Sequence, residues 1–263
     1  MTKGKEVAVT NGTGTAVALS DDMVSRLAEY AKTTQQKEVM TGQFFGTRAG
    51  ILTFNKTPLP NNSMDVVILR AMFENVYYPG AFNPQNIESP LCFAFSDSGV
   101  GMVPHDDATE QQSSACDGCP QLEWKLHPDG KRRKSCKETR RLSCMPVSAT
   151  EGAQKVIDST VGYLRVPVTS VKHWQAYAQK LAAGGIPPFA AVTRVTVSPD
   201  PVTQIKISFE CLRTITDPDV LAALFQRHDA EADRMSFPYE KRQAPTEAQP
   251  LPPPGAPATP GKF

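Results

Sequence analysis

Residues 161–185 read VGYLRVPVTSVKHWQAYAQKLAAGG, and this stretch says the most about the fold. Its first six residues are mainly aliphatic and aromatic, which predicts a strand at 161–166. From Thr169 onward apolar side chains recur every three or four residues. This spacing predicts an amphipathic helix that is ended by Gly184 and Gly185, with one face formed by Val171, Trp174, Tyr177, Ala178 and Leu181.

Strand patterns lie on both sides of this stretch. Upstream, residues 44–54 and 64–73 are rich in β-branched and aromatic side chains and are separated by a segment with two prolines and two asparagines, so they predict two strands of one sheet. Downstream, residues 190–197 and 204–212 alternate around the turn sequence SPDPVT. This alternation predicts a β-hairpin.

Two further helices are predicted, one after Ser20 and one from about Asp217 to Asp233. Residues 89–146 differ from the rest, because they carry cysteines, turn residues and positive charge but few aliphatic residues. With that segment set aside as an insertion, the order is three strands, a helix and two strands, which is the order of an OB-fold. We therefore predict a mainly β, α+β protein with an OB-like five-stranded barrel, although other small β domains with one helix share this order.

The composition is that of an ordinary globular chain. Lys and Arg number 28 against 27 Asp and Glu, so a charged partner has to be met by a local patch and not by the net charge of +1. No window approaches the roughly 18 apolar residues of a membrane helix, and the N-terminus lacks a secretory signal, so we expect an intracellular protein with no membrane partner. We predict a flexible N-terminus at 1–18, a core at 19–242 and a disordered proline-rich tail at 243–263.

Five of the six cysteines cluster, which favours metal binding over disulfides in a chain without a secretion signal. Cys116 and Cys119 are separated by two residues, with Gly118 permitting the bend, and Cys136 follows after sixteen intervening residues. This spacing indicates a structural Zn²⁺ site. It does not settle the fourth ligand, for which the candidates are Cys144, His127, His105 and Cys92. The competing interpretation is a turn with unliganded thiols.

A run of positive charge overlaps the cysteine cluster. Its members are Lys125, Lys131, Arg132, Arg133, Lys134, Lys137, Arg140 and Arg141. Such a run is often only a solvated loop. Fixed by a metal, however, it presents its charges in one direction and loses less entropy when it binds phosphates.

Aromatic residues near these charges are candidates for stacking on nucleic-acid bases. Trp124 lies beside Lys125, and Tyr77, Tyr78 and Phe82 lie in a segment with Pro and Gly that has no clear period, which favours a loop. Trp124 is equally well explained as an anchor in a small core next to the metal. The sequence has no GxSxG, Walker or HExxH motif, so we expect no enzyme.

Three quoted segments together resemble a known family. They are SPLCFAFSDSGV at 89–100, CDGCP at 116–120 and KSCKETRRL at 134–142, and they resemble the zinc-containing OB-fold single-stranded DNA-binding proteins of tailed phages. YLRVP at 163–167 and the helix and hairpin after it look like the same family. The resemblance covers about 89–214.

The resemblance implies a function and a ligand set. It implies Cys92 as the fourth zinc ligand with Cys116, Cys119 and Cys136, and leaves Cys144 spare. It implies sequence-nonspecific binding of single-stranded DNA in phage replication or recombination, in the cytoplasm of the infected host, where other replication or recombination proteins are candidate partners. The expected phosphate contacts are Lys131, Arg132, Arg133, Lys134, Arg140, Arg141, Arg165 and Lys206, and the expected stacking residues are Tyr77, Tyr78 and Trp124.

Two features depart from that family. The segment between Cys119 and Cys136 is bulkier and more charged than the short Gly-rich connection of the family, so the resemblance does not assign its role in DNA contact. The chain ends in Gly261-Lys262-Phe263 and not in an acidic tip, so recruitment of partners through the tail is not implied. The alternative function is a zinc-stabilised adaptor of a virion or a regulatory complex, without preference for single strands.

Overall fold

The computed structural model describes residues 8–10, 16–18, 22–23, 26, 43–80, 88–127, 130–237 and 239. The predicted tail at 243–263, Phe82 and most of the predicted helix after Ser20 lie outside the described residues. Within the predicted flexible N-terminus, strands β1 (Ala8–Thr10) and β2 (Ala16–Ala18) pair antiparallel.

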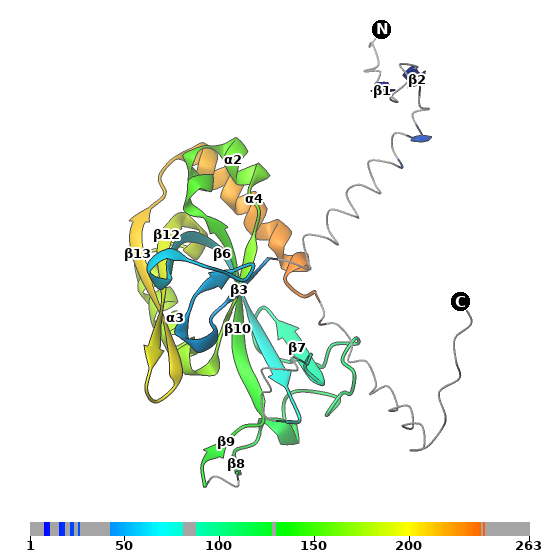
Figure 1. Ribbon diagram of the computed structural model, residues 1–263, viewed down its shortest axis with the longest axis vertical. Coiled ribbons are helices and arrows are strands. Elements are labelled where there is room, and N and C mark those ends of the chain that lie inside the picture. Colours follow the sequence, from blue (N-terminus) through cyan, green and yellow to red (C-terminus); the bar gives the residue numbers. More distant parts are fainter. Residues whose placement is uncertain are drawn as a thin grey trace, which may run out of the picture.

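One sheet of nine strands has the long strand β6 (Ser63–Tyr77) near its middle. Figure 1 shows that the sheet curls into a half-barrel. The strand order is β13-β12-β6-β10-β11-β3-β4-β5, and β7 also pairs with β6. The other strands are β3 (Phe44–Gly46), β4 (Thr53–Phe54), β5 (Thr57–Pro58), β7 (Cys92–Ser96), β10 (Cys136–Pro146), β11 (Gly162–Val166), β12 (Ala191–Asp200) and β13 (Gln204–Thr214).

Strand β6 is shared between two parts of the sheet. One edge pairs with β10 along eleven residues of that strand. On the other edge, β12 pairs antiparallel with Ser63–Val67 and β7 pairs antiparallel with Phe73–Tyr77. This edge of β6 therefore has two partners in turn, β12 along its first residues and β7 along its last residues. Cys92 is the first residue of β7.

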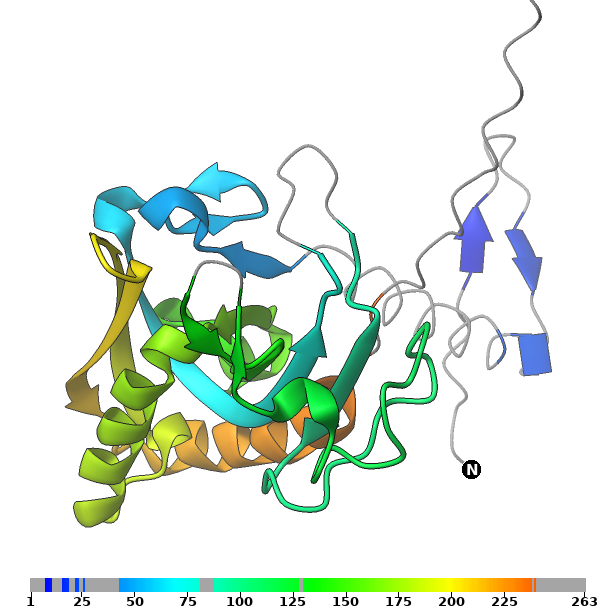
Figure 2. The same cartoon turned by 90° about the horizontal axis from the view of Figure 1, so that it is seen from below.

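Both faces of the sheet are covered. Helix α3 (Val168–Ala183) packs on one face, where its Trp174 and Leu181 join Val66 and Ile68 in a core. Helices α2 (Ala153–Asp158) and α4 (Pro218–Arg234) pack on the other face in a second core. In Figure 2, α3 is the yellow-green helix and α4 is the orange helix. Because both faces are buried, the start of β6 is apolar at four consecutive positions, Val66, Val67, Ile68 and Leu69.

Several sequence predictions are confirmed. The chain is mixed α+β, with three α-helices and a barrel-like sheet among its described residues. Strand 161–166, the helix after it and the hairpin are present as β11, α3 and β12–β13. At the start of α4, the Asp217 side chain accepts hydrogen bonds from the backbone N–H groups of Asp219 and Val220, each at 3.0 Å.

The strands differ from the prediction in several places. Strand β6 continues to Tyr77, so Tyr77 lies in a strand and not in the expected loop. Residues 92–96, inside the expected insertion, form β7 beside β6.

Residues 136–146, placed by the sequence analysis inside the insertion, form the long strand β10 at the centre of the sheet. Its polar residues obscured the pattern, because Thr139 and Arg141 are buried against a polar partner, Glu74, and not against apolar side chains. The stretch 44–54 forms only the short strands β3 and β4 beside β11.

The first described residues after α4 pack against the sheet. The Phe237 ring lies 5.0 Å from Tyr163 and 5.5 Å from Phe44 between ring centroids, and Arg141 donates to the carbonyls of Met235 and Phe237 at 2.9 and 3.2 Å.

Removing residues 243–263 is expected to leave the melting temperature unchanged, because a proline-rich tail offers little to bury. Removing residues 236–263 is expected to lower the free energy of unfolding by about 1.5–3 kcal/mol, which is the order of burying one Phe side chain. Thermal unfolding of the two truncated proteins tests this. Equal melting temperatures would show that the Phe237 contacts contribute nothing.

Candidate metal centre and nucleic-acid surface

Two of the cysteines are positioned by the sheet. In the register of β6, Tyr77 lies directly opposite Cys92 of β7 on one side and Cys136 of β10 on the other. Directly opposed residues of paired strands project from the same face of a sheet. The three side chains therefore project from one face, and so does Asn75, two residues earlier in β6.

The other two cysteines are positioned by a turn. The Cys116 N–H donates to the Met102 carbonyl at 2.8 Å, and the Cys119 N–H donates back to the Cys116 carbonyl at 3.1 Å. Gly118 has φ of 77°, a left-handed conformation that glycine adopts at little cost. A 3₁₀ turn (Pro120–Leu122) follows directly.

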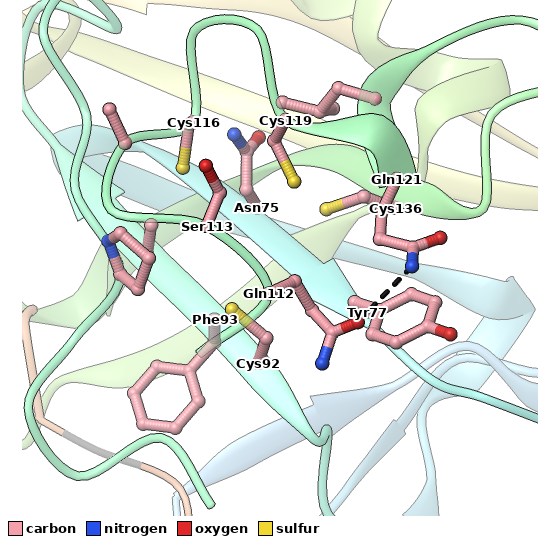
Figure 3. Close-up of a pocket in the computed structure, with 14 residues that line it drawn as sticks. Asn75, Tyr77, Cys92, Phe93, Gln112, Ser113, Cys116, Cys119, Gln121 and Cys136 are labelled. Carbon is pink, nitrogen blue, oxygen red and sulfur yellow. Dashed lines mark hydrogen bonds between the residues drawn. The ribbon is translucent and has the colours of Figure 1, made fainter. Parts of the chain in front are cut away.

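All four cysteines line one cavity of about 20 Å³, which is roughly the room for one water-sized sphere. Figure 3 shows the sulfurs of Cys116, Cys119 and Cys136 directed into this space, with Cys92 at its lower side. None of the four is in a disulfide. We call this space the cysteine cavity.

The polar residues Asn75 and Gln112 line the cavity beside the sulfurs. The Asn75 side-chain amide donates to the Met102 sulfur at 3.6 Å, and the Gln112 side-chain carbonyl accepts from the Gln121 amide at 3.1 Å. Burial raises the pKa of the Cys92, Cys116 and Cys136 thiols, and the neighbouring sulfurs add to the rise, so that the pKa of Cys136 is about 12. A bound cation would have the opposite effect on these pKa values, because its positive charge favours the thiolate form.

Four cysteine thiols are suitable ligands for a soft metal ion such as zinc, but their positions in the structure do not form a closed site. No group of three or more His, Cys, Asp or Glu side chains within the described ranges is arranged to hold a metal as it stands. Cys92 and Cys136 are each one strand away from Tyr77, so their backbones are about 10 Å apart. Sulfurs around a tetrahedral zinc ion lie only about 3.8 Å apart. Closure around one ion therefore requires the Cys92 and Cys136 side chains to turn toward each other.

The remaining ligand candidates lie elsewhere. Cys144 is buried in the hydrophobic core beneath α3. The His105 ring stacks on Phe93 and accepts a hydrogen bond from the Asp107 N–H at 3.1 Å, and His127 lies in the basic hairpin. None of these three lines the cysteine cavity. Of the four candidates for the fourth ligand, Cys92 is the one that shares the cavity with Cys116, Cys119 and Cys136.

The basic run begins in a small hairpin next to the cysteines. Strands β8 (Lys125–Leu126) and β9 (Arg132–Arg133) pair antiparallel, and in Figure 1 they lie at the end of the molecule away from α2. Lys125, Arg132, Arg133 and also Lys131 are exposed. We call residues 124–134 the basic hairpin.

Trp124 is part of this hairpin and not of a core. Its side chain is 61% exposed, and the Lys134 ammonium lies 6.0 Å from its ring centroid. Lys134 also bonds the Glu138 carboxylate at 2.5 Å, which offsets part of its charge. The exposed indole therefore presents a flat apolar surface among cations.

Arg140 and Arg141 point to opposite faces of β10. The Arg140 guanidinium is half-buried and lies 3.6 Å from the centroid of the Phe73 ring. Arg141 is 2% exposed, and its N–H groups are bonded to Glu74 and to the carbonyls of Met235 and Phe237. Because these partners occupy its donors inside the protein, we remove Arg141 from the expected phosphate contacts.

Glu74 is the centre of a buried ionic network that the sequence analysis missed. Its carboxylate accepts from Arg141 at 2.5 Å, Arg165 at 2.9 Å, Thr139 at 2.9 Å and Tyr239 at 2.6 Å. Burial by itself raises the pKa of Glu74, but the adjacent Arg165 and Arg141 outweigh it and hold the pKa below its usual value. No sequence pattern marks Glu74, because it begins a segment whose lack of a clear period favours a loop.

The other predicted contacts are dispersed. Arg165 is paired with Glu74 at 2.9 Å, and its side chain remains 37% exposed. Tyr77 and Tyr78 are half-buried at the end of β6, and Tyr77 lines the cysteine cavity. Lys206 is exposed on β13, close to the hairpin turn. The structure thus gathers Trp124 and the residues from Lys131 to Lys134, and leaves Arg165 and Lys206 on the sheet.

Searches for similar proteins returned no matching family model, no matching curated protein and no matching solved structure. In the described part of the chain, no helix has both the length and the apolar character needed to cross a membrane.

Proposed function

We propose that this protein binds single-stranded DNA without sequence preference, using a zinc-ordered basic hairpin beside an OB-like sheet. The observation that carries the proposal is the basic hairpin itself. It places the exposed indole of Trp124 among exposed cations. Its second strand ends at Arg133, three residues before Cys136. The phosphates of a DNA strand would pair with the cations, and its bases would stack on the indole. Neither contact depends on the base sequence of the DNA.

The strand pairing supports the OB-like assignment. Strands β6, β10 and β11 are consecutive antiparallel neighbours in the sheet, α3 follows them, and β12 returns to β6 with β13 outside it. OB-folds bind oligonucleotides on their second and third strands, between the loop joining strands one and two and the loop joining strands four and five. In this assignment the first of those loops is the segment between β6 and β10, which contains Cys92, Cys116, Cys119 and the basic hairpin.

Zinc has a structural role in this proposal. Bound by Cys92, Cys116, Cys119 and Cys136, it would tie the turn at 116–119 to β7 and β10, and a closed site with four thiolates leaves no position for a substrate. With the ends of its loop tied, the hairpin would lose less conformational entropy on binding a strand.

Replacing Arg132 and Arg133 together with alanine is expected to weaken binding to every single-stranded sequence. The slope of log affinity against log salt should flatten by about 0.7 for each phosphate that the variant no longer neutralises. Fluorescence anisotropy of a labelled oligonucleotide in a salt series measures both quantities. The matched control replaces Lys172 and Lys180, two cations of α3, and is expected to leave both unchanged.

Replacing Trp124 with alanine separates stacking from charge. It is expected to weaken binding by about 1–3 kcal/mol with almost the same salt slope. If the arginine pair leaves affinity unaltered, the basic hairpin is not the DNA surface. If duplex and single-stranded oligonucleotides bind equally, the zinc-stabilised adaptor becomes the better description.

A further inference from the structure

Among the described residues, the Arg140 guanidinium lacks a carboxylate partner. Four other arginines of the sheet each pair with a carboxylate, and they are Arg70, Arg141, Arg165 and Arg194. Arg140 instead donates one hydrogen bond within the described part of the chain, to the carbonyl of its neighbour Thr139 at 2.8 Å. A half-buried cation in this condition is available to a bound ligand.

The guanidinium lies on an aromatic ring. Arg140 of β10 is directly opposite Phe73 of β6, and its Cζ atom is 3.6 Å from the centroid of the Phe73 ring. This is the distance of atoms in van der Waals contact. A planar guanidinium that stacks on a ring has a second face for another planar group, which the ammonium of a lysine does not have.

The loop after β7 holds the Phe73 ring in place. The Ser96 hydroxyl accepts hydrogen bonds from the N–H groups of Ser98 and Gly99 at 3.2 and 3.0 Å. A Cβ atom at position 99 would lie 2.5 Å from a ring carbon of Phe73, so the Gly99 backbone packs directly against the ring. The next residue, Val100, is 78% exposed and adds apolar surface next to this contact.

The basic hairpin lies close to Arg140 along the chain. Arg140 projects from the same face of β10 as Cys136, because alternate residues of a strand share a face. Arg133, the last residue of β9, is seven residues before Arg140, which is at most about 23 Å of extended chain. A single strand held by the basic hairpin covers this distance with several nucleotides.

We propose that Arg140 and Phe73 form a base-stacking platform, in which the ring holds the guanidinium and the guanidinium stacks on one base of the bound strand. Bases of single strands stack on arginine planes as they do on aromatic rings. The inference rests on the proposed function and deepens it, because it assigns Arg140 to a base and not to a phosphate.

The test measures the affinity of the full-length protein for a labelled single-stranded oligonucleotide of mixed sequence. Arg140→Lys keeps the positive charge and removes the planar group, and it is expected to weaken binding about 5-fold or more, the loss of one stacked base. The slope of log affinity against log salt should stay the same. The matched control is Arg194→Lys, the same exchange on β12, which is expected to bind as the unaltered protein does.

A second oligonucleotide distinguishes stacking from a phosphate contact. It has the same length and consists of abasic sites, so it carries the phosphates without the bases. Arg140→Lys and the unaltered protein are expected to bind this strand equally. Phe73→Leu should weaken binding of the mixed-sequence strand in the unaltered background, but not further in the Arg140→Lys background, because the ring acts through the guanidinium.

The outcomes separate the two proposals. If the unaltered protein binds no single-stranded DNA, the proposed function is wrong and the platform is wrong with it. If replacing Arg132 and Arg133 weakens binding and Arg140→Lys does not, the platform alone is overturned. Equal losses of Arg140→Lys on the mixed-sequence and abasic strands would make Arg140 a phosphate contact and also overturn the platform, as would additive losses from Phe73→Leu and Arg140→Lys.

Discussion

Replacing Glu74 with alanine is expected to lower the free energy of unfolding by about 3–5 kcal/mol, the usual cost of removing one partner of a buried ion pair. The Glu74 carboxylate is fully buried, and Arg141 beside it is 2% exposed. Without the carboxylate, the Arg141 guanidinium would remain inside the protein with no opposite charge. Arg165 and Tyr239 would also lose their shared partner.

The matched control is Asp65→Ala. Asp65 forms a bidentate pair with Arg194 at 2.8 and 2.9 Å, but both side chains are partly exposed, at 31% and 44%. Exposed pairs contribute about 0–1 kcal/mol. Chemical denaturation of both variants compares the two sites directly, and a loss at Glu74 no larger than at Asp65 would contradict the network as a main stabilising element.

The same network gives a pH dependence with a definite sign. The pKa of Glu74 is lower in the folded protein than its usual value, because Arg165 and Arg141 outweigh the effect of burial. The stabilisation is therefore complete above the unfolded-state pKa of about 4.3 and is lost as the pH falls through the lower folded-state pKa. Glu74→Ala should lose less stability to acid than the unaltered protein does over that range.

Replacing Cys136 with serine is expected to reduce zinc content from about one ion per chain to a small fraction, because a structural site needs all four of its ligands. Ligation contributes folding free energy, on the order of 10–16 kcal/mol in small zinc modules, so the segment between β6 and β10 should also lose stability. Single-stranded DNA binding should weaken in parallel, since strand β9 of the basic hairpin ends three residues before Cys136.

The matched control is Cys211→Ser, which makes the same chemical change on β13, outside the cysteine cavity. Metal analysis and thermal unfolding should distinguish the two variants. Cys144→Ser is a poorer control, because Cys144 is buried in the core and a hydroxyl there destabilises the fold whether or not zinc is bound. Full zinc content in Cys136→Ser would overturn the ligand set.

Local patterns in the sequence determined the elements that depend on local physics. The helical period of Trp174, Tyr177 and Leu181 fixes which face of α3 is buried, and the Asp217 side chain caps α4 through N–H groups two and three residues away. The turn from Cys116 to Cys119 is also local, since it depends on a bend at Gly118.

Only the tertiary structure decided the features that depend on partners distant in sequence. Strand β10 has a polar sequence because its buried Arg141 and Thr139 are satisfied by Glu74, which lies more than 60 residues away in the chain. The same pairing with β6 brings Cys92 and Cys136 to either side of Tyr77 and withdraws Arg141 from the surface. Spacing along a chain reports which residues can meet across one turn, whereas strand register decides which residues meet across a sheet and which charges face water.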